Sequence, residues 1–385
     1  MKRNIFYFPL EPVKSRYTYQ LSSSWMPDSL SKFDWNIVVI DGELQQEKDI
    51  KVGHVLDSIG RSVFSFSQMS NFLKNHLDKG IVKNDDILFF QDFWTPGVEA
   101  IYYALDLHHI KVKTYSQVWA QSVDEYDFTY SMRHWMRPFE LGFDKVHNGI
   151  FVASSVHKEQ LKSSGFNSPV HVMSLPVDIS QVTAMVDKVK KKKQVLFSSR
   201  MNSEKNPLFM MKTAEEFLKR NKDYTWVCTT SSPEFRSEDP FILEQLNSLS
   251  QREPRFILKN NLSKKEYYEI ISESEVQFNS SLQDYVAFTM IEATSFDCKL
   301  VYPEFRSFPE CILDKNYLYS PFILDDAVQV LEKVISMKTS SLQSKVLDIT
   351  NLGRLFESYI MFNDIEKEFN IWLEYDLISG KYNAK

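Results

Sequence analysis

Cysteine is scarce in this sequence, and its three cysteines, Cys228, Cys298 and Cys311, form no pair at metal-binding spacing. The sequence therefore predicts neither a metal centre nor a disulfide framework, and it fits a reducing compartment. No apolar run approaches the roughly 18 residues of a membrane-spanning helix. The N-terminal stretch MKRNIFYFPLEP has too short an apolar run for a signal peptide and reads as a first strand. We therefore expect a soluble, cytoplasmic protein.

The sequence also lacks an excess of positive charge. Lysine and arginine total 45 against 51 aspartate and glutamate residues, which gives a net charge of -6. This balance excludes a protein that binds nucleic acid over a broadly basic surface, but it leaves a local basic groove open. We interpret the run of lysines at 190–193 as a solvated linker in preference to a DNA-binding patch.

Glycine is limited to 10 of the 385 residues, whereas apolar residues make up 43%, enough for two domain cores. Short apolar runs alternate with helical patterns, which predicts an α/β fold of two parallel sheets covered by helices on both faces. We expect domains at 1–180 and 181–350, with a surface helix or hinge at 180–193 and a long terminal helix at 351–385. The predicted strands lie at 4–8, 36–41, 86–91, 111–116, 149–154, 168–176, 194–199, 224–230, 255–259, 275–281 and 299–303.

The segment FSSRMNSEKNP, residues 197–207, joins a predicted strand to a predicted helix. Pro207 suits the first turn of that helix, where unbonded N–H groups carry the positive end of the helix dipole. Arg200 and Lys205 stand at the same turn, and we expect both on its exposed surface. An arginine that forks across two oxygens and a lysine point charge suit a diphosphate, although cations also decorate turns that bind nothing.

A second strand–loop–helix segment, NSSLQDYVAFTMIEATSFD at 279–297, carries two carboxylates. Asp284 lies in the loop, and Glu292 follows in the second turn of a helix that we expect to start near Ala287. A carboxylate near a helix start accepts two hydrogen bonds from a ribose diol in dinucleotide-binding folds. The alternative is that Glu292 is simply a helix former in an amphipathic helix.

Four segments in this order resemble family 4-like retaining glycosyltransferases of the GT-B fold. SSRMNSEKNP resembles the Arg-x4-Lys segment that opens their second domain, and DYVAFTMIEA resembles their Glu-x7-Glu motif. The stretch at 152–179 resembles their link between domains, and YPEFRSFPECI at 302–312 resembles a later strand and loop with a proline–glutamate pair. The resemblance implies two Rossmann-like domains that face a cleft, with a last helix that crosses back to the first domain.

The resemblance also implies roles for individual residues. Arg200 and Lys205 would bind the donor diphosphate, and Glu292 would bind the ribose. Asp284 stands at the first glutamate position and is the catalytic candidate near the transferred sugar, with a shorter reach than glutamate. The implied co-substrate is a nucleotide sugar, which we expect to be UDP-linked, and no separate cofactor or metal is expected. The family's glycines after the first strand are replaced here by FPLEPVKSRYTYQ, so side chains must do the recognition there.

The first 150 residues carry little of this resemblance, and acceptor candidates there come from predicted strand ends. Asp92 and Asp124 are candidates for contacting the acceptor hydroxyl, and the alternative for each is a helix cap or a surface charge. Further candidates for binding the acceptor lie after the first strand and in the segment 115–140. These are Glu11, Arg16, Arg133, Trp135 and Arg137.

The first candidate acceptor is 5-hydroxymethylcytosine in phage DNA. EPVKSRYTYQLSSSW at 11–25 and RSFPE loosely resemble glycosyltransferases of large DNA phages, and the scarcity of glycine with plentiful Phe, Lys, Asn and Ser fits AT-rich coding sequence. Arg133, Trp135 and Arg137 mix cations with an aromatic ring, which suits an extruded base, but they also fit a helix with one packed tryptophan. A surface glycan or lipid-linked acceptor, a GT-B sugar epimerase or phosphorylase, and a non-catalytic binding protein are the alternatives.

Overall fold

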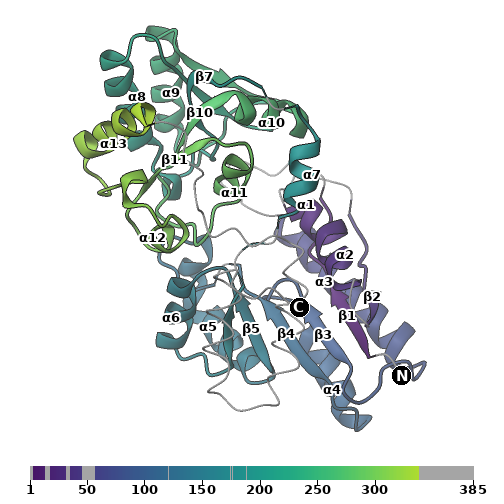
Figure 1. Ribbon diagram of the computed structural model, residues 1–385. Coiled ribbons are helices and arrows are strands. Elements are labelled where there is room, and N and C mark those ends of the chain that lie inside the picture. The colour runs from purple at the N-terminus through teal and green to yellow at the C-terminus, as the bar shows by residue number, and fades with distance from the viewer. Residues whose placement is uncertain are drawn as a thin grey trace, which may run out of the picture. The chain divides into compact units, whose positions relative to one another are not determined.

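The computed structural model describes residues 3–13, 18–31, 35–45, 57–119, 121–173, 175, 177–187 and 189–337. The described chain divides into two compact units, which we call unit 1, up to Val177, and unit 2, from Asp178 onward. Figure 1 shows unit 1 in purple to blue and unit 2 in teal to yellow-green. The terminal helix expected at 351–385 lies outside the described residues.

Unit 1 is built on a parallel sheet of six strands in the order β2-β1-β3-β4-β5-β6. The strands are β1 (Asn4–Phe8), β2 (Asn36–Val39), β3 (Ile87–Phe90), β4 (Lys113–Gln117), β5 (Gly149–Val152) and β6 (Val170–Val172). The helices are α1 (Thr18–Gln20), η1 (Leu21–Trp25), α2 (Met26–Ser31), α3 (Ser58–Phe72), η2 (Leu73–Leu77), α4 (Val98–Leu107), η3 (Phe128–Met132), α5 (Arg133–Asp144) and α6 (Ser155–Ser163).

Aromatic side chains fill the core of unit 1. Phe6 meets Phe72 of α3 edge to face at 5.2 Å, and Phe8 stacks on Phe90 of the neighbouring strand at 4.5 Å. β1 and β3 are buried because helices cover both faces of a parallel sheet, so these strands read as unbroken apolar runs in the sequence. β2, at the sheet edge, is only partly buried.

Unit 2 repeats the architecture with a parallel sheet in the order β12-β11-β10-β7-β8-β9. The strands are β7 (Lys192–Phe197), β8 (Thr225–Thr229), β9 (Phe256–Lys259), β10 (Ser274–Phe278), β11 (Lys299–Pro303) and β12 (Leu318–Tyr319). The helices are α7 (Ile179–Ala184), η4 (Ser203–Lys205), α8 (Pro207–Arg220), α9 (Pro240–Arg252), α10 (Lys264–Glu273), α11 (Phe288–Ser295), α12 (Phe308–Cys311), η5 (Lys315–Tyr317) and α13 (Leu324–Ser336).

The structure confirms the predicted α/β class, and a strand lies within or across every predicted strand range. The two-residue strand β12 was not predicted, because Leu318–Tyr319 is too short to show an alternation. The interpretation of the lysine run as a linker is wrong at its end, since Lys192 and Lys193 begin β7. Their side chains stay exposed but pair with Glu273 and Asp223.

No helix within the described ranges has both the length and the apolar character needed to cross a bilayer. The three cysteines are all free and buried. Burial raises the pKa of the Cys228 and Cys298 thiols, which keeps both thiols protonated and unreactive. Cysteine chemistry is therefore not expected at either position.

Candidate active site

The turn between β7 and α8 is shaped by one residue in a left-handed conformation. Asn206 has φ 50° and ψ 53°, a region in which asparagine is enriched among non-glycine residues. Pro207 follows as the first residue of α8, where its missing N–H removes no hydrogen bond. The first turn of α8 therefore presents unbonded N–H groups at the carboxyl end of β7, as the sequence predicted.

Lys205 is the buried cation of this turn. Its side chain is 9% exposed, and its Nζ lies 2.6 Å from Oδ1 of Asp284 and 3.3 Å from Oγ of Ser281. The Ser280 hydroxyl donates to the carbonyl oxygen of Lys205 at 2.7 Å, which ties the loop after β10 to the turn. The expectation that Lys205 is exposed was therefore wrong, because the loop that carries Asp284 covers it.

Arg200 differs from Lys205 in its exposure. Its side chain is 50% exposed, and Nη2 bonds to Oε1 of Glu204 at 2.9 Å within the same turn. An exposed arginine with a single carboxylate partner is able to turn toward an arriving anion. The turn thus combines one buried, fixed cation with one exposed, adaptable cation.

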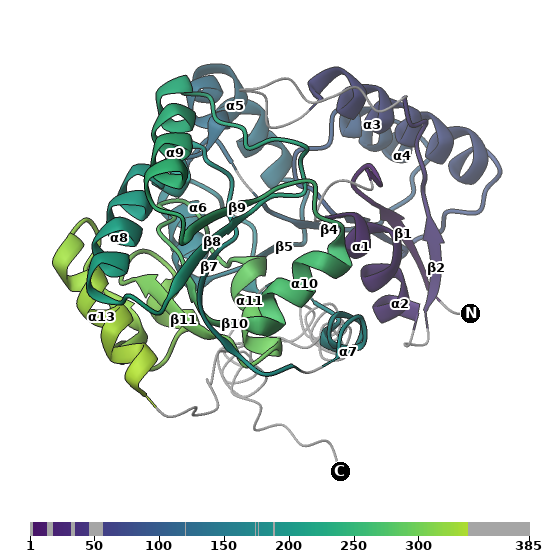
Figure 2. The same cartoon turned by 90° about the horizontal axis from the view of Figure 1, so that it is seen from above.

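Glu292 is a buried carboxylate held by three donors. It is 5% exposed and accepts hydrogen bonds at 3.0 Å from Nζ of Lys264 and from the hydroxyls of Tyr267 and Tyr268. All three donors lie on α10, which packs beside α11 (Figure 2). Burial and the nearby Glu292 charge raise the pKa of Tyr267 and Tyr268, so both hydroxyls stay protonated.

The start of α10 explains how these donors are positioned. Ser263 and Glu266 form a capping box, in which the serine hydroxyl accepts from the Glu266 N–H and the Glu266 carboxylate accepts from the Ser263 N–H. This cap fixes the first turn, so Lys264 and Tyr267 project together toward α11. Glu292 is therefore more than a helix former, and the helix starts at Phe288 after Ala287, as predicted.

In unit 1, Arg61 brings two of the predicted residues together. Its Nη1 lies 3.1 Å from Oε2 of Glu11, and its Nη2 lies 3.2 Å from Oδ2 of Asp92. Glu11 follows β1 and Asp92 follows β3, so both carboxylates come from the carboxyl ends of adjacent strands. Burial raises the pKa of Asp92 to about 6, and the Arg61 charge opposes that rise.

Arg61 was missed by the sequence interpretation. It lies in the first turn of α3, where the helix dipole disfavours a cation, so the two carboxylates must compensate its charge. The only local signal is an arginine among small and apolar residues in SIGRSVFSF. Nothing in that pattern indicates which carboxylates it would meet.

Other predicted acceptor residues are engaged within unit 1. Asp124 is fully buried, and its Oδ1 accepts from the N–H of Tyr126 in a local turn at 3.1 Å. Arg137 donates to the carbonyl oxygen of Ser164 and lies 5.9 Å from the ring centre of Phe166. Arg16 lies outside the described residues.

Arg133 and Trp135 lie on the exposed part of α5. The Arg133 guanidinium lies 4.1 Å from the ring centre of Tyr130 and donates to the Tyr130 carbonyl. Trp135 is 42% exposed and meets Trp94 edge to face at 5.8 Å. The alternative of one tryptophan packed inside a helix bundle is thus wrong for Trp135.

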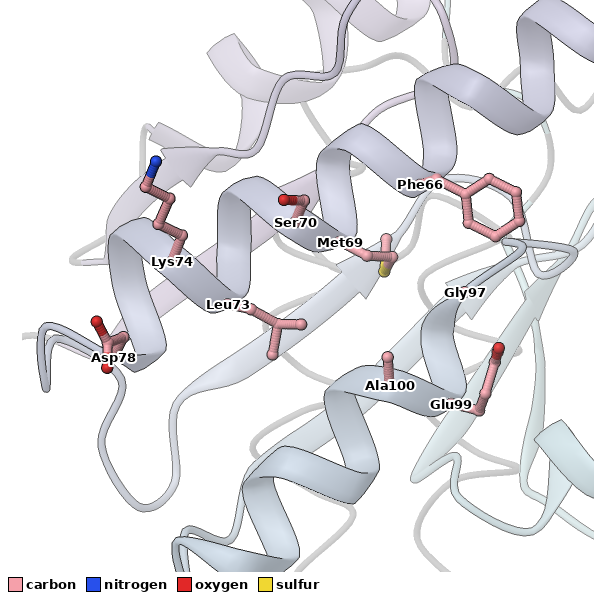
Figure 3. Close-up of a pocket in the computed structure, with 9 residues that line it drawn as sticks. All are labelled: Phe66, Met69, Ser70, Leu73, Lys74, Asp78, Gly97, Glu99 and Ala100. Carbon is pink, nitrogen blue, oxygen red and sulfur yellow. The ribbon is translucent and has the colours of Figure 1, made fainter.

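The largest groove in the described part of unit 1 is separate from these residues. It has a volume of about 680 Å³ and runs between α3, η2 and α4, where Phe66 and Met69 face Gly97 (Figure 3). A side chain at Gly97 would come within 2.9 Å of the Phe66 ring, and its φ of 89° also favours glycine. None of the predicted site residues lines this groove.

No group of three or more His, Cys, Asp or Glu residues suited to a metal occurs in the described ranges. The charged groups that the two sheets gather at their carboxyl ends are ion pairs. These are Lys205–Asp284 and Lys264–Glu292 in unit 2, and Arg61 with its two carboxylates in unit 1.

Comparison with known proteins gives the fold. No protein-family model matches the sequence, and no curated protein is similar to it in sequence. The structure is similar to sucrose-phosphate synthase from Thermosynechococcus elongatus, with a TM-score of 0.62, 10% identity and 100% of each chain covered. It is also similar to an alpha,alpha-trehalose-phosphate synthase (UDP-forming) from Burkholderia vietnamiensis, with a TM-score of 0.60, 13% identity, and 98% of this chain and 99% of that chain covered.

A third similar structure is S. aureus TarM, solved with UDP and alpha-GlcNAc-glycerol, at a TM-score of 0.53 and 15% identity. This match covers 82% of the chain and 59% of TarM, so the chain spans less than two thirds of that protein. The chain has the GT-B fold of glycosyltransferases, with two parallel-sheet, Rossmann-like units. At these identities the likeness establishes the fold, and the activity has to be argued from the residues.

Proposed function

We propose that this chain is a nucleotide-sugar-dependent glycosyltransferase that transfers a sugar to an acceptor hydroxyl with retention. The observation that carries the proposal is the buried ammonium of Lys205, placed beside the first turn of α8 at the carboxyl end of β7. Arg200 adds a second, exposed cation at the same turn. A diphosphate is the anion that matches two cations and a row of free N–H groups.

These groups also suit the chemistry of transfer. When the sugar–phosphate bond breaks, negative charge develops on the departing nucleoside diphosphate, and preorganised cations stabilise it. Lys205 is already fixed in place, so little reorganisation is needed at that moment. The departing phosphate is the candidate to take the proton from the acceptor hydroxyl, and Asp284 lies within contact of Lys205, near the expected position of the sugar.

Glu292 is the proposed ribose-binding residue. A carboxylate accepts about four hydrogen bonds, and Lys264, Tyr267 and Tyr268 occupy three positions on Glu292. A ribose diol needs two, so one of the present donors has to yield. The Lys264 side chain is 39% exposed and is the donor best able to move into solvent. UDP is the proposed nucleotide, in line with the UDP named for two of the similar structures.

Hydroxymethylcytosine in DNA, with the enzyme in the cytoplasm of the phage host, remains the acceptor proposed from the sequence. Exposed Trp135 and Arg133 support it, since aromatic and guanidinium faces stack on bases. The second candidate is a saccharide acceptor, as in the synthesis of a surface glycan or glycolipid. The observation that favours it is the carboxylate of Asp92 beside Trp94, because carboxylates accept hydrogen bonds from sugar hydroxyls.

The test is a panel of nucleotide sugars, each incubated with the protein alone, with hydroxymethylated DNA and with simple saccharides. Release of free nucleotide together with a glycosylated product supports the proposal, and Lys205→Ala should abolish most of it. Lys212→Ala, an exposed lysine on the same helix α8, is the matched control and should retain activity. A rearranged donor without transfer would indicate an epimerase, and sugar phosphate without nucleotide a phosphorylase. Nucleotide binding without any product would indicate a binding protein.

A further inference from the structure

Three aromatic side chains cluster on the surface of unit 1. Trp94 meets Trp135 at 5.8 Å and Phe139 at 6.5 Å, and Trp135 meets Phe139 at 6.4 Å, each edge to face. Trp135 and Phe139 are 42% and 56% exposed, although both carry large apolar rings. We call these three residues the aromatic cluster. A cluster this exposed needs an explanation, because large apolar rings are usually covered in a folded domain.

A carboxylate is fixed directly beside this cluster. Oδ1 of Asp92 accepts from the N–H of Trp94 at 3.1 Å, and Nη2 of Arg61 bonds to both Oδ2 of Asp92 and the Trp94 carbonyl, at 3.2 and 3.4 Å. The Asp92 side chain is 21% exposed, so part of the carboxylate faces solvent. Arg61 thus locks the acid and the first ring of the cluster into one arrangement.

We propose that the aromatic cluster and Asp92 form a subsite for a saccharide ring of the acceptor, an inference that rests on the proposed transferase function. A pyranose ring has a face of C–H groups, which buries well against aromatic rings, and a rim of hydroxyls, which donate to carboxylates. Trp135 and Phe139 supply the apolar surface, and Asp92 accepts from a hydroxyl at the rim. Arg61 acts as a positioning residue that holds Asp92.

The charges around Asp92 favour a neutral sugar over a nucleic acid. Arg61 is the cation shared by two carboxylates, those of Asp92 and Glu11, so this group of three carries net negative charge when all are ionised. A phosphodiester backbone beside it would be repelled, whereas an uncharged polyol is not. Arg137, which the DNA hypothesis needs as a phosphate contact, donates instead to the Ser164 carbonyl.

The inference is tested by saturation-transfer NMR with four named probes: maltose, cellobiose, trehalose and N-acetylglucosamine. The proteins compared are wild type, Trp135→Ala, Trp135→Phe, Asp92→Asn and the control Tyr103→Ala, which removes a 72% exposed aromatic ring from α4. We expect at least one probe to bind the wild type and Tyr103→Ala equally. Its affinity should fall about tenfold or more in Trp135→Ala and Asp92→Asn, and Trp135→Phe should restore part of it. Thermal melting confirms that each variant is folded.

The inference is overturned if none of the four probes binds, or if binding is the same in Trp135→Ala. It is also overturned if a hydroxymethylcytosine oligonucleotide binds in a Trp135-dependent way while no saccharide does. Nucleotide release from donors in the absence of acceptor is measured separately and reports on the transferase function. Saccharide binding without donor turnover would retain the subsite and reject the proposed function, and the reverse result would do the opposite.

Discussion

Lys205 and Asp284, which are 79 positions apart in the sequence, are joined by a 2.6 Å contact between Nζ and Oδ1. Each residue belongs to a different strand–loop–helix segment, and the parallel sheet places the two loops at the same edge because β7 and β10 are neighbours. The ammonium therefore has a carboxylate partner before any ligand arrives. A bound diphosphate would share or displace this partner.

Replacing Lys205 with alanine should weaken both donor binding and folding. Asp284 would lose its buried cation while its own side chain remains only 25% exposed, which costs about 1–3 kcal/mol in the free energy of unfolding. Loss of a charge-assisted contact should also lower UDP affinity about tenfold or more. Urea unfolding and calorimetric titration measure the two effects. The double variant Lys205→Ala/Asp284→Ala should regain stability but not affinity, and unchanged UDP affinity in both would reject the assignment.

Replacing Arg200 with alanine should weaken donor binding and leave stability unchanged. Its side chain is 50% exposed, and its pair with Glu204 is a surface pair of the kind that contributes only about 0–1 kcal/mol. We expect UDP affinity to fall about tenfold with a melting temperature equal to that of wild type. If Glu204→Ala reproduces the loss of affinity, then Arg200 acts through the shape of the turn and does not touch the phosphate.

Replacing Glu292 with glutamine should reduce donor affinity through the ribose. The amide turns one acceptor oxygen into a donor that faces the tyrosine hydroxyls, so one hydrogen bond becomes a repulsive contact. We expect a loss of about tenfold or more for UDP and a smaller loss for its 2′,3′-dideoxy analogue. Tyr268→Phe is the control, since it removes one donor to Glu292 without changing the carboxylate. Equal losses for the two nucleotides would show that Glu292 does not contact the diol.

The raised pKa of Asp92 gives stability a specific pH dependence. Since burial raises this pKa to about 6, the folded protein holds the proton more tightly than the unfolded chain does. This contribution to stability is present below about pH 4 and is lost as the pH rises through about 6. We expect the unfolding free energy of wild type, relative to Asp92→Asn, to fall by about 1–3 kcal/mol between about pH 4 and pH 7.

The comparison with Asp92→Asn is needed because His147 titrates in the same interval with the opposite sign. Burial lowers its pKa to about 4, so its contribution is lost as the pH falls from about 6.5. His147 is present in both proteins, and its effect cancels in the difference. A difference that stays constant over the interval would contradict the raised pKa of Asp92.

Replacing Arg137 with alanine should lower stability without changing how activity depends on salt. Its guanidinium donates to the Ser164 carbonyl and lies against the Phe166 ring, so its role is to hold α5 to the loop after α6. We expect a loss of about 1 kcal/mol in unfolding free energy. Arg133→Ala, at a more exposed position on α5, is the matched comparison. A flatter salt dependence of transfer in Arg137→Ala alone would return this residue to a phosphate-binding role.

Much of the fold is readable from the sequence because buried parallel strands leave unbroken apolar runs. NIFYF and KLVYP coincide with β1 and β11. The start of α11 was also predicted, because DYVAFTMIEA matches a known strand–loop–helix motif. The burial of Lys205 was not predicted, since nothing local to the turn shows that the loop after β10 covers it.

The partners of the site residues are the part that the sequence hides. Lys264, Tyr267 and Tyr268 meet Glu292 from 24 to 28 positions away, and Arg61 meets Glu11 across 50 positions. Such contacts depend on which helices pack together, and no periodicity in a single segment specifies them. The lysine run misled for a similar reason, because the pairing of β7 with β10 converts its last residues into a strand.

The left-handed backbone at Asn206 limits which amino acids this position accepts. Glycine, asparagine and aspartate adopt that conformation readily, whereas a β-branched residue would strain it. The carbonyl oxygens of Lys205 and Asn206 both accept from the Ser280 hydroxyl, at 2.7 and 3.3 Å, so a distorted turn would not stay confined to one loop. In natural or selected variants of this chain, position 206 should therefore vary little even though its side chain takes no part in the proposed chemistry. Variation there should appear together with changes at position 280.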